Sequence, residues 1–96
     1  MKYDATIKHA TIVRTKGNDL ALELSLAVKR DGKGQDMVIN VPSEDLLNTL
    51  RFLFSLSGSE DLSDLEGEII NVRTNEHDLP DAISNPRDSI FWHILK

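Results

Sequence analysis

The stretch Leu20-Ala21-Leu22-Glu23-Leu24-Ser25-Leu26-Ala27-Val28 decides the fold. Large apolar residues stand at every second position, and smaller or polar residues stand between them. Because the side chains of a β-strand point alternately to the two faces of a sheet, this stretch predicts a strand with one apolar face on a core. A helix would spread the leucines around its circumference. Leucine is not a strong strand former, so the pattern rather than the propensity supports this prediction.

A strand is predicted on each side of this one. Residues 3–15 alternate less regularly, and Ile12 breaks their parity, which predicts a bulge or burial on both faces. Residues 30–34 form a hairpin loop with two glycines. Residues 36–41 alternate again and end at Pro42, since proline has no N–H to donate to a ladder.

A helix is predicted over residues 44–57, because the hydrophobic period changes there. The apolar positions of one helical stripe are Leu46, Leu47, Leu50, Leu53 and Phe54. Ser43 is the predicted N-cap, since its hydroxyl can accept from a free backbone N–H, and Gly58 is the predicted C-terminal stop. The stripe and the leucine face of 20–28 are expected to pack together.

The remainder of the chain predicts a short turn at 59–65, ended by Gly67, and a strand at 68–74. Residues 75–89 are polar, contain two prolines and are expected to form a loop. Residues 90–95 are apolar on both faces, which predicts a last strand buried on two sides.

These elements predict one α+β domain over residues 1–96. The expected architecture is an antiparallel five-stranded sheet in the order β-β-β-α-β-β, with one main helix packed on it. The alternative is an OB-like, partly closed barrel, in which a helix also falls between strands three and four.

Composition narrows the compartment and the partners. The chain has no cysteine, no apolar run of the about 18–20 residues that a membrane span needs, and no apolar stretch at its start, which favours the cytoplasm. Its net charge of −5 opposes affinity for nucleic acid. The charge is uneven: residues 1–34 carry +3 and residues 35–96 carry −8.

An acidic stretch is the strongest candidate for a binding surface. Its five carboxylates, with no basic residue among them, belong to Glu60, Asp61, Asp64, Glu66 and Glu68. Such a cluster can imitate a row of phosphates and engage a basic groove on a partner protein. The alternative is a surface that only keeps the protein in solution. A secondary candidate is the basic turn of Lys29, Arg30 and Lys33, which could bind a polyanion or be an ordinary exposed turn.

Catalytic and metal sites are not predicted. The three histidines, His9, His77 and His93, have no helical or turn spacing that would pair them on a metal. No nucleophile elbow or phosphate loop is present, and Gly32-Lys33-Gly34 lies between two strands. We therefore expect neither an enzyme nor a cofactor. A deep pocket lined by His9 or His93 would instead favour a small hydrolase or ligand-binding protein.

Three short motifs resemble those of small, uncharacterised phage-encoded proteins. They are Gly32-Lys33-Gly34-Gln35, Leu65-Glu66-Gly67-Glu68 and Trp92-His93-Ile94-Leu95. Trp92 replaces a glycine of the resembled pattern, which also has a further glycine pair where this chain has Asp36 and Met37. The resemblance implies a phage or prophage accessory protein in a bacterial cytoplasm, and it implies no catalytic residues.

The predicted function is non-enzymatic binding of a protein with a basic surface, including inhibition of a host defence complex of the CRISPR type through the acidic stretch. The alternative is an OB-like protein that binds single-stranded nucleic acid. That alternative needs exposed aromatic residues, whereas Phe54 and Trp92 are expected in the core. An exposed edge strand could also pair across a two-fold axis and form a homodimer.

Overall fold

The computed structural model describes residues 2–30 and 32–95, and for Arg30 and residues 88–91 it describes the backbone alone. The elements are β1 (Lys2–Arg14), β2 (Leu20–Arg30), β3 (Lys33–Val41), α1 (Ser43–Ser57), the short 3-10 helix η1 (Leu62–Leu65), β4 (Ile69–Thr74), β5 (Pro80–Asn85) and β6 (Asp88–Ile94). The protein therefore has the predicted α+β class with one main helix.

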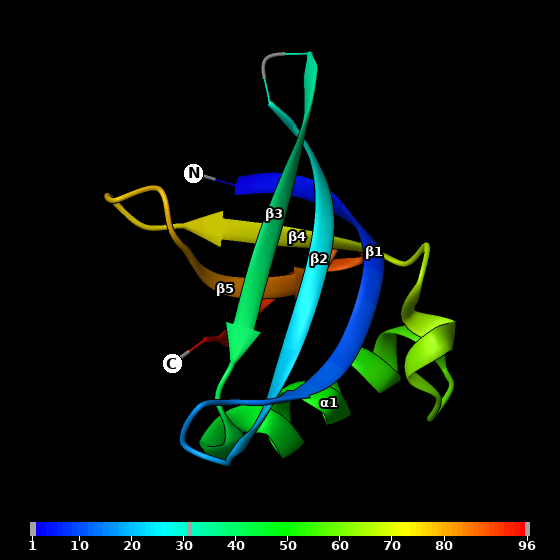
Figure 1. The fold of residues 1–96 in the computed structure, drawn as a ribbon. Helices are drawn as coiled ribbons and strands as arrows, with labels where there is room; N and C mark the ends of the chain where they lie inside the picture. The colour runs from blue at the N-terminus through cyan, green and yellow to red at the C-terminus, as the bar shows by residue number, and fades with distance from the viewer. Residues whose placement is uncertain (1, 31, 96) are drawn as a thin grey trace.

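The six strands of the described residues belong to one antiparallel sheet, in the order β3-β2-β1-β4-β5-β6, and Figure 1 labels the first five of them. The prediction of five strands is wrong by one. Strands β3 and β6 form the two edges and do not pair with each other, so the described sheet is open. The OB-like alternative agrees with the helix lying between the third and fourth strands, but a closed barrel is not formed.

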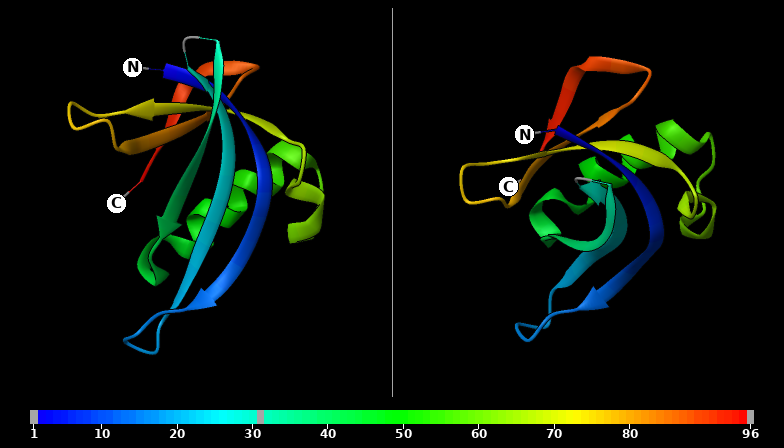
Figure 2. Two further views of the ribbon diagram at one scale, coloured as in Figure 1. Left: turned by 45° about the horizontal axis from the view of Figure 1, so that its top comes forward. Right: turned by 90° about the horizontal axis from the view of Figure 1, so that it is seen from above.

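The sheet folds over itself because the two ends of β1 pair with different strands. Residues 2–6 of β1 pair with β4, while residues 5–14 pair with β2. The long strands β1–β3 cross over β4 and β5, and α1 lies at one end of the space between them (Figures 1 and 2). The ladder to β2 shifts register between Ile7 and His9. The predicted bulge is thus present, and it lets Ile7 and Ala10 both face the core.

The alternation of β2 is seen in the core. This strand contributes the fully buried side chains of Leu22, Leu24, Leu26 and Val28, each no more than 1% exposed. Helix α1 adds the buried Leu53, and Leu46, Leu50 and Phe54 pack partly buried against the same cluster. The predicted stripe is wrong at Leu47, which is 61% exposed, because the stripe facing the core is narrower than the sequence suggested.

The two ends of α1 differ from each other in how they are capped. Pro42, in an extended conformation, occupies the N-cap, and no side-chain hydrogen bond caps this end. The predicted N-cap Ser43 is instead the first helical residue, so that prediction is wrong. Gly58 ends the helix as predicted, with φ of 71° and its N–H donating to the carbonyl of Phe54. A left-handed residue at this position is best supplied by glycine.

Strand β5 is the main error of the sequence prediction, which made residues 75–89 a loop. Ala82 and Ile83 are fully buried within it. Pro80 stands at the first position of the strand, where proline is tolerated, so the residue that suggested a loop marks a strand end.

Strand β6 lies at an edge and is not buried on both faces as predicted. Ile94 is 51% exposed, while His93 points to the helix side and Leu95 packs against the core. Of the residues that suggested double burial, the side chains of Ile90 and Phe91 lie outside the described part.

Candidate functional site

The five predicted carboxylates lie on the segment that joins α1 to β4 through η1, hereafter the acidic segment (residues 60–68). Glu60, Asp61, Asp64 and Glu66 are exposed, and Glu68 is half-buried. All five therefore lie on one short stretch of the chain, which Figure 1 shows in yellow-green between α1 and β4.

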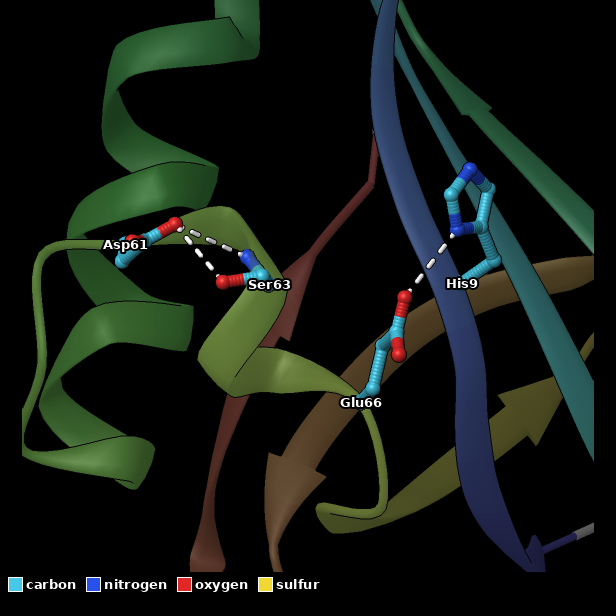
Figure 3. A network of polar contacts seen from close by, with 4 residues as sticks. All are labelled: His9, Asp61, Ser63 and Glu66. Atoms are coloured by element: carbon cyan, nitrogen blue, oxygen red, sulfur yellow. Dashed lines mark hydrogen bonds and ion pairs between the residues drawn. The ribbon is translucent and has the colours of Figure 1, made fainter.

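The conformation of the acidic segment is fixed by its own side chains. The hydroxyl of Ser59 donates to the carboxylate of Asp64 and accepts the N–H of Asp61 at 3.2 Å. Asp61 Oδ1 in turn accepts from the backbone N–H and the hydroxyl of Ser63, at 3.1 and 3.0 Å (Figure 3). Asp61 is therefore the N-cap of η1, which satisfies a backbone N–H at the helix start.

Two backbone hydrogen bonds and one buried side chain attach the acidic segment to β1. The N–H of Gly67 donates to the carbonyl of Ile7, and the N–H of Ile7 donates to the carbonyl of Glu68, both at 2.8 Å. Leu65 is fully buried in the core. Gly67 has φ of 88°, a conformation that side chains other than that of glycine rarely adopt, which explains why glycine ends this turn.

One basic side chain contacts these carboxylates in the described part of the chain. The imidazole Nδ1 of His9, a residue of β1, lies 3.3 Å from Glu66 Oε1 (Figure 3). Both side chains are more than half exposed, so solvent screens this contact and its contribution to stability is small. The negative charge of Glu60, Asp61, Asp64 and Glu68 is not neutralised by any ion pair among the described residues.

The predicted basic turn lies at a projecting hairpin. Strands β2 and β3 pair as far as Arg30 with Lys33, whereas β1 pairs with β2 only as far as Val28, so the tip extends beyond the rest of the sheet (Figure 1). Lys29 and Lys33 are exposed, and no ion pair among the described residues involves them. The side chain of Arg30 lies outside the described part.

A third group of side chains was missed from the sequence. Trp92 was expected in the core, but it stands on β6 with two cations over its ring: Lys2 Nζ at 5.9 Å and Arg73 Cζ at 5.6 Å from the ring centroid. Arg73 is itself held by Asp81, with Nε donating to Oδ1 at 2.9 Å. Period-two alternation places Trp92 on the face opposite His93. This alternation was the feature of the sequence that could have shown that Trp92 and His93 face different surroundings.

The side chain of His93 contacts helix α1. His93 Nε2 lies 2.9 Å from the hydroxyl of Thr49, and its ring stacks on Phe52 with centroids 5.3 Å apart. These contacts pack the His93 ring against α1. Neither His9 nor His93 lines any of three surface depressions found in the described chain. Among the described residues, no group of three or more histidine, aspartate or glutamate side chains could hold a metal ion.

Comparisons of the chain with protein-family models, with curated proteins and with solved structures find no match. Within residues 2–30 and 32–95, no helix has the length and apolar character needed to cross a membrane.

Proposed function

We propose that this protein is a non-enzymatic binding module whose acidic segment engages a basic surface of a partner protein. The observation that supports this proposal is that five carboxylates stand on one short segment whose backbone is fixed by Asp61, Ser59 and two hydrogen bonds to β1. A segment whose backbone is already held in place loses little conformational entropy on binding. Their uncompensated charge would also accelerate the approach of a basic partner.

The partner would be a protein whose lysines and arginines otherwise hold nucleic acid. The carboxylates of the acidic segment would take the positions of phosphates and block that groove. Together with the resemblance to phage-encoded proteins, this chemistry suggests an accessory protein that inhibits a host defence complex of the CRISPR type in a bacterial cytoplasm. Nucleic acid should then compete with the protein for the same partner.

The test compares two variants of equal charge. In the first, Asp61→Asn, Asp64→Asn and Glu66→Gln neutralise the acidic segment, and asparagine can still cap η1 at position 61. In the matched control, Asp19→Asn, Glu44→Gln and Glu76→Gln remove three exposed carboxylates elsewhere. Immobilised wild type and both variants are exposed to a bacterial lysate, and the retained proteins are quantified by mass spectrometry.

The expected result is a basic, nucleic-acid-binding protein that wild type and the control retain and the first variant loses. With that protein purified, the affinity of the first variant should be lower by about tenfold or more at low salt, and the difference should shrink as salt is added. Equal retention by both variants would reject the acidic segment as the binding surface.

A further inference from the structure

Trp92 and the basic residues around it form a second surface that is separate in its residues from the acidic segment. Arg73 is fixed over the ring by its ion pair with Asp81. Lys2 is exposed, and no ion pair among the described residues holds it, so its contact with the ring is the one that a ligand can replace. The face of an indole that attracts cations is also the face on which a nucleobase stacks.

Lys2 connects this ring to a depression of about 550 Å³ at the start of β1. Lys2 and Lys29 both line the depression, and so does the half-buried aromatic ring of Tyr3. Lys33 follows on the same hairpin, one residue from Gly34, which also lines it. Aromatic rings, a depression and a row of lysines are therefore adjacent, which is the combination that proteins use to bind single strands.

The geometry points to a binding site for single-stranded nucleic acid, with a base stacked on Trp92 and phosphates held by Lys2, Arg73 and Lys29. A single strand fits better than a duplex, because a base must leave its partner to reach the ring. The site goes beyond the proposed protein-binding function and uses none of the residues of the acidic segment.

The net charge of −5 weakens any such complex, and two carboxylates lie at the site. Asp81 is paired with Arg73, but Asp4 lines the depression and no ion pair among the described residues neutralises it. Asp4 should therefore repel a phosphate. This makes a gain of affinity testable as well as a loss, since Asp4→Asn removes the repulsion without changing the shape of the side chain.

The experiment measures fluorescence anisotropy of a labelled dT12 oligonucleotide with the full chain at low salt, beside an abasic strand of the same length and charge. Binding of dT12 should be at least about fivefold tighter than binding of the abasic strand, from the usual size of one stacking contact. Trp92→Ala should remove that difference and Trp92→Phe should keep most of it. Asp4→Asn should tighten binding.

Lys2→Ala should weaken binding and lower the slope of log affinity against log salt by about 0.7. Lys16→Ala, an exposed lysine in the β1–β2 turn, is the control and should bind as wild type does. If circular dichroism shows Trp92→Ala to be unfolded, the abasic strand, Lys2→Ala and Asp4→Asn decide the question alone.

Three outcomes would overturn the site: no binding of dT12 at millimolar protein, equal binding of the abasic strand, or no effect of the Lys2 and Asp4 substitutions. The variant with the neutralised acidic segment distinguishes this site from the proposed function. That variant should lose the protein partner and still bind dT12 at least as well as wild type does.

Discussion

The two halves of the sheet differ in regularity. Strands β2 and β3 pair from Leu22–Val41 to Arg30–Lys33 without a shift of register. The β4–β5 and β5–β6 ladders each contain a shift within a few residues. The β2–β3 hairpin turns its alternating leucines to the core and carries the basic turn at its tip, whereas β4 and β6 bring Arg73 and Trp92 into contact. Candidate binding residues therefore occur in both halves, although only one half has uninterrupted strand pairing.

The acidic segment lies where the two halves meet. Its Gly67 and Glu68 pair with the backbone of Ile7, directly after the Thr6–Ile69 pair, and so extend the β1–β4 ladder. The register shift between Ile7 and His9 belongs to the other edge of β1, which pairs with β2. The following substitutions test how far the two halves are really distinct.

The largest effect is expected from the shared core. Leu24→Ala in β2 and Ile83→Ala in β5 each remove a fully buried side chain, and each should lower the free energy of unfolding by about 2–5 kcal/mol. Urea denaturation of both variants checks this. If Ile83→Ala costs less than about 1 kcal/mol, the irregular half does not share the core of the regular one.

The next effect concerns the contact that ties β6 to α1. Thr49→Val leaves the imidazole of His93 without its hydroxyl partner at 2.9 Å and should cost about 1–3 kcal/mol. A double-mutant cycle with His93→Phe isolates the interaction. Ser55→Ala on the exposed side of the same helix is the control and should have little effect. Additive costs of the two substitutions in the cycle would show that Thr49 and His93 do not interact.

A smaller effect is expected at the turn that positions the acidic segment. Gly67→Ala places a side chain at φ of 88° and should cost about 1–2 kcal/mol, measured by thermal unfolding. Gly34→Ala is the matched control, since its φ is ordinary and nothing lies within 4 Å of the added carbon. Equal costs at both positions would contradict the role of Gly67.

The smallest effect is expected on the outer side of α1. Leu47→Ala removes a largely exposed side chain and should change the free energy of unfolding by no more than about 0.5 kcal/mol. Leu53→Ala, on the buried side, should cost about 2–5 kcal/mol. A large cost for Leu47→Ala would mean that another surface covers it.

The strands of the regular half could be predicted because the alternation of their apolar and polar residues is visible in the sequence. The alternation of residues 20–28 and the αL position of Gly58 are local features, and both were confirmed. Strand β5 escaped prediction because its three buried residues, Ala82, Ile83 and Ser84, are consecutive, show no period and follow a proline. Such a strand is defined by its neighbours in space, which the chain order does not reveal.

The candidate sites could also be predicted only in part. The charges of the acidic segment can be read from its residues, but its attachment to Ile7 depends on the pairing of β1 with β4, which the order of elements does not reveal. The surroundings of Trp92 involve Lys2 and Arg73, which lie far from it in the chain. The pairing of β1 with β4 places Lys2 beside Arg73, and the β4–β5 and β5–β6 ladders bring Trp92 to them.

That pairing also bears on how fast the protein folds. Among the described ladders, β1–β4 is the one that joins strands not consecutive in the chain, linking residues 2–6 to residues 69–73. The hairpins on either side can form by closing short loops, whereas this ladder must close a loop that contains most of the chain. We expect its formation to limit the refolding rate, so that substitutions there slow refolding while those in β6 mainly speed unfolding.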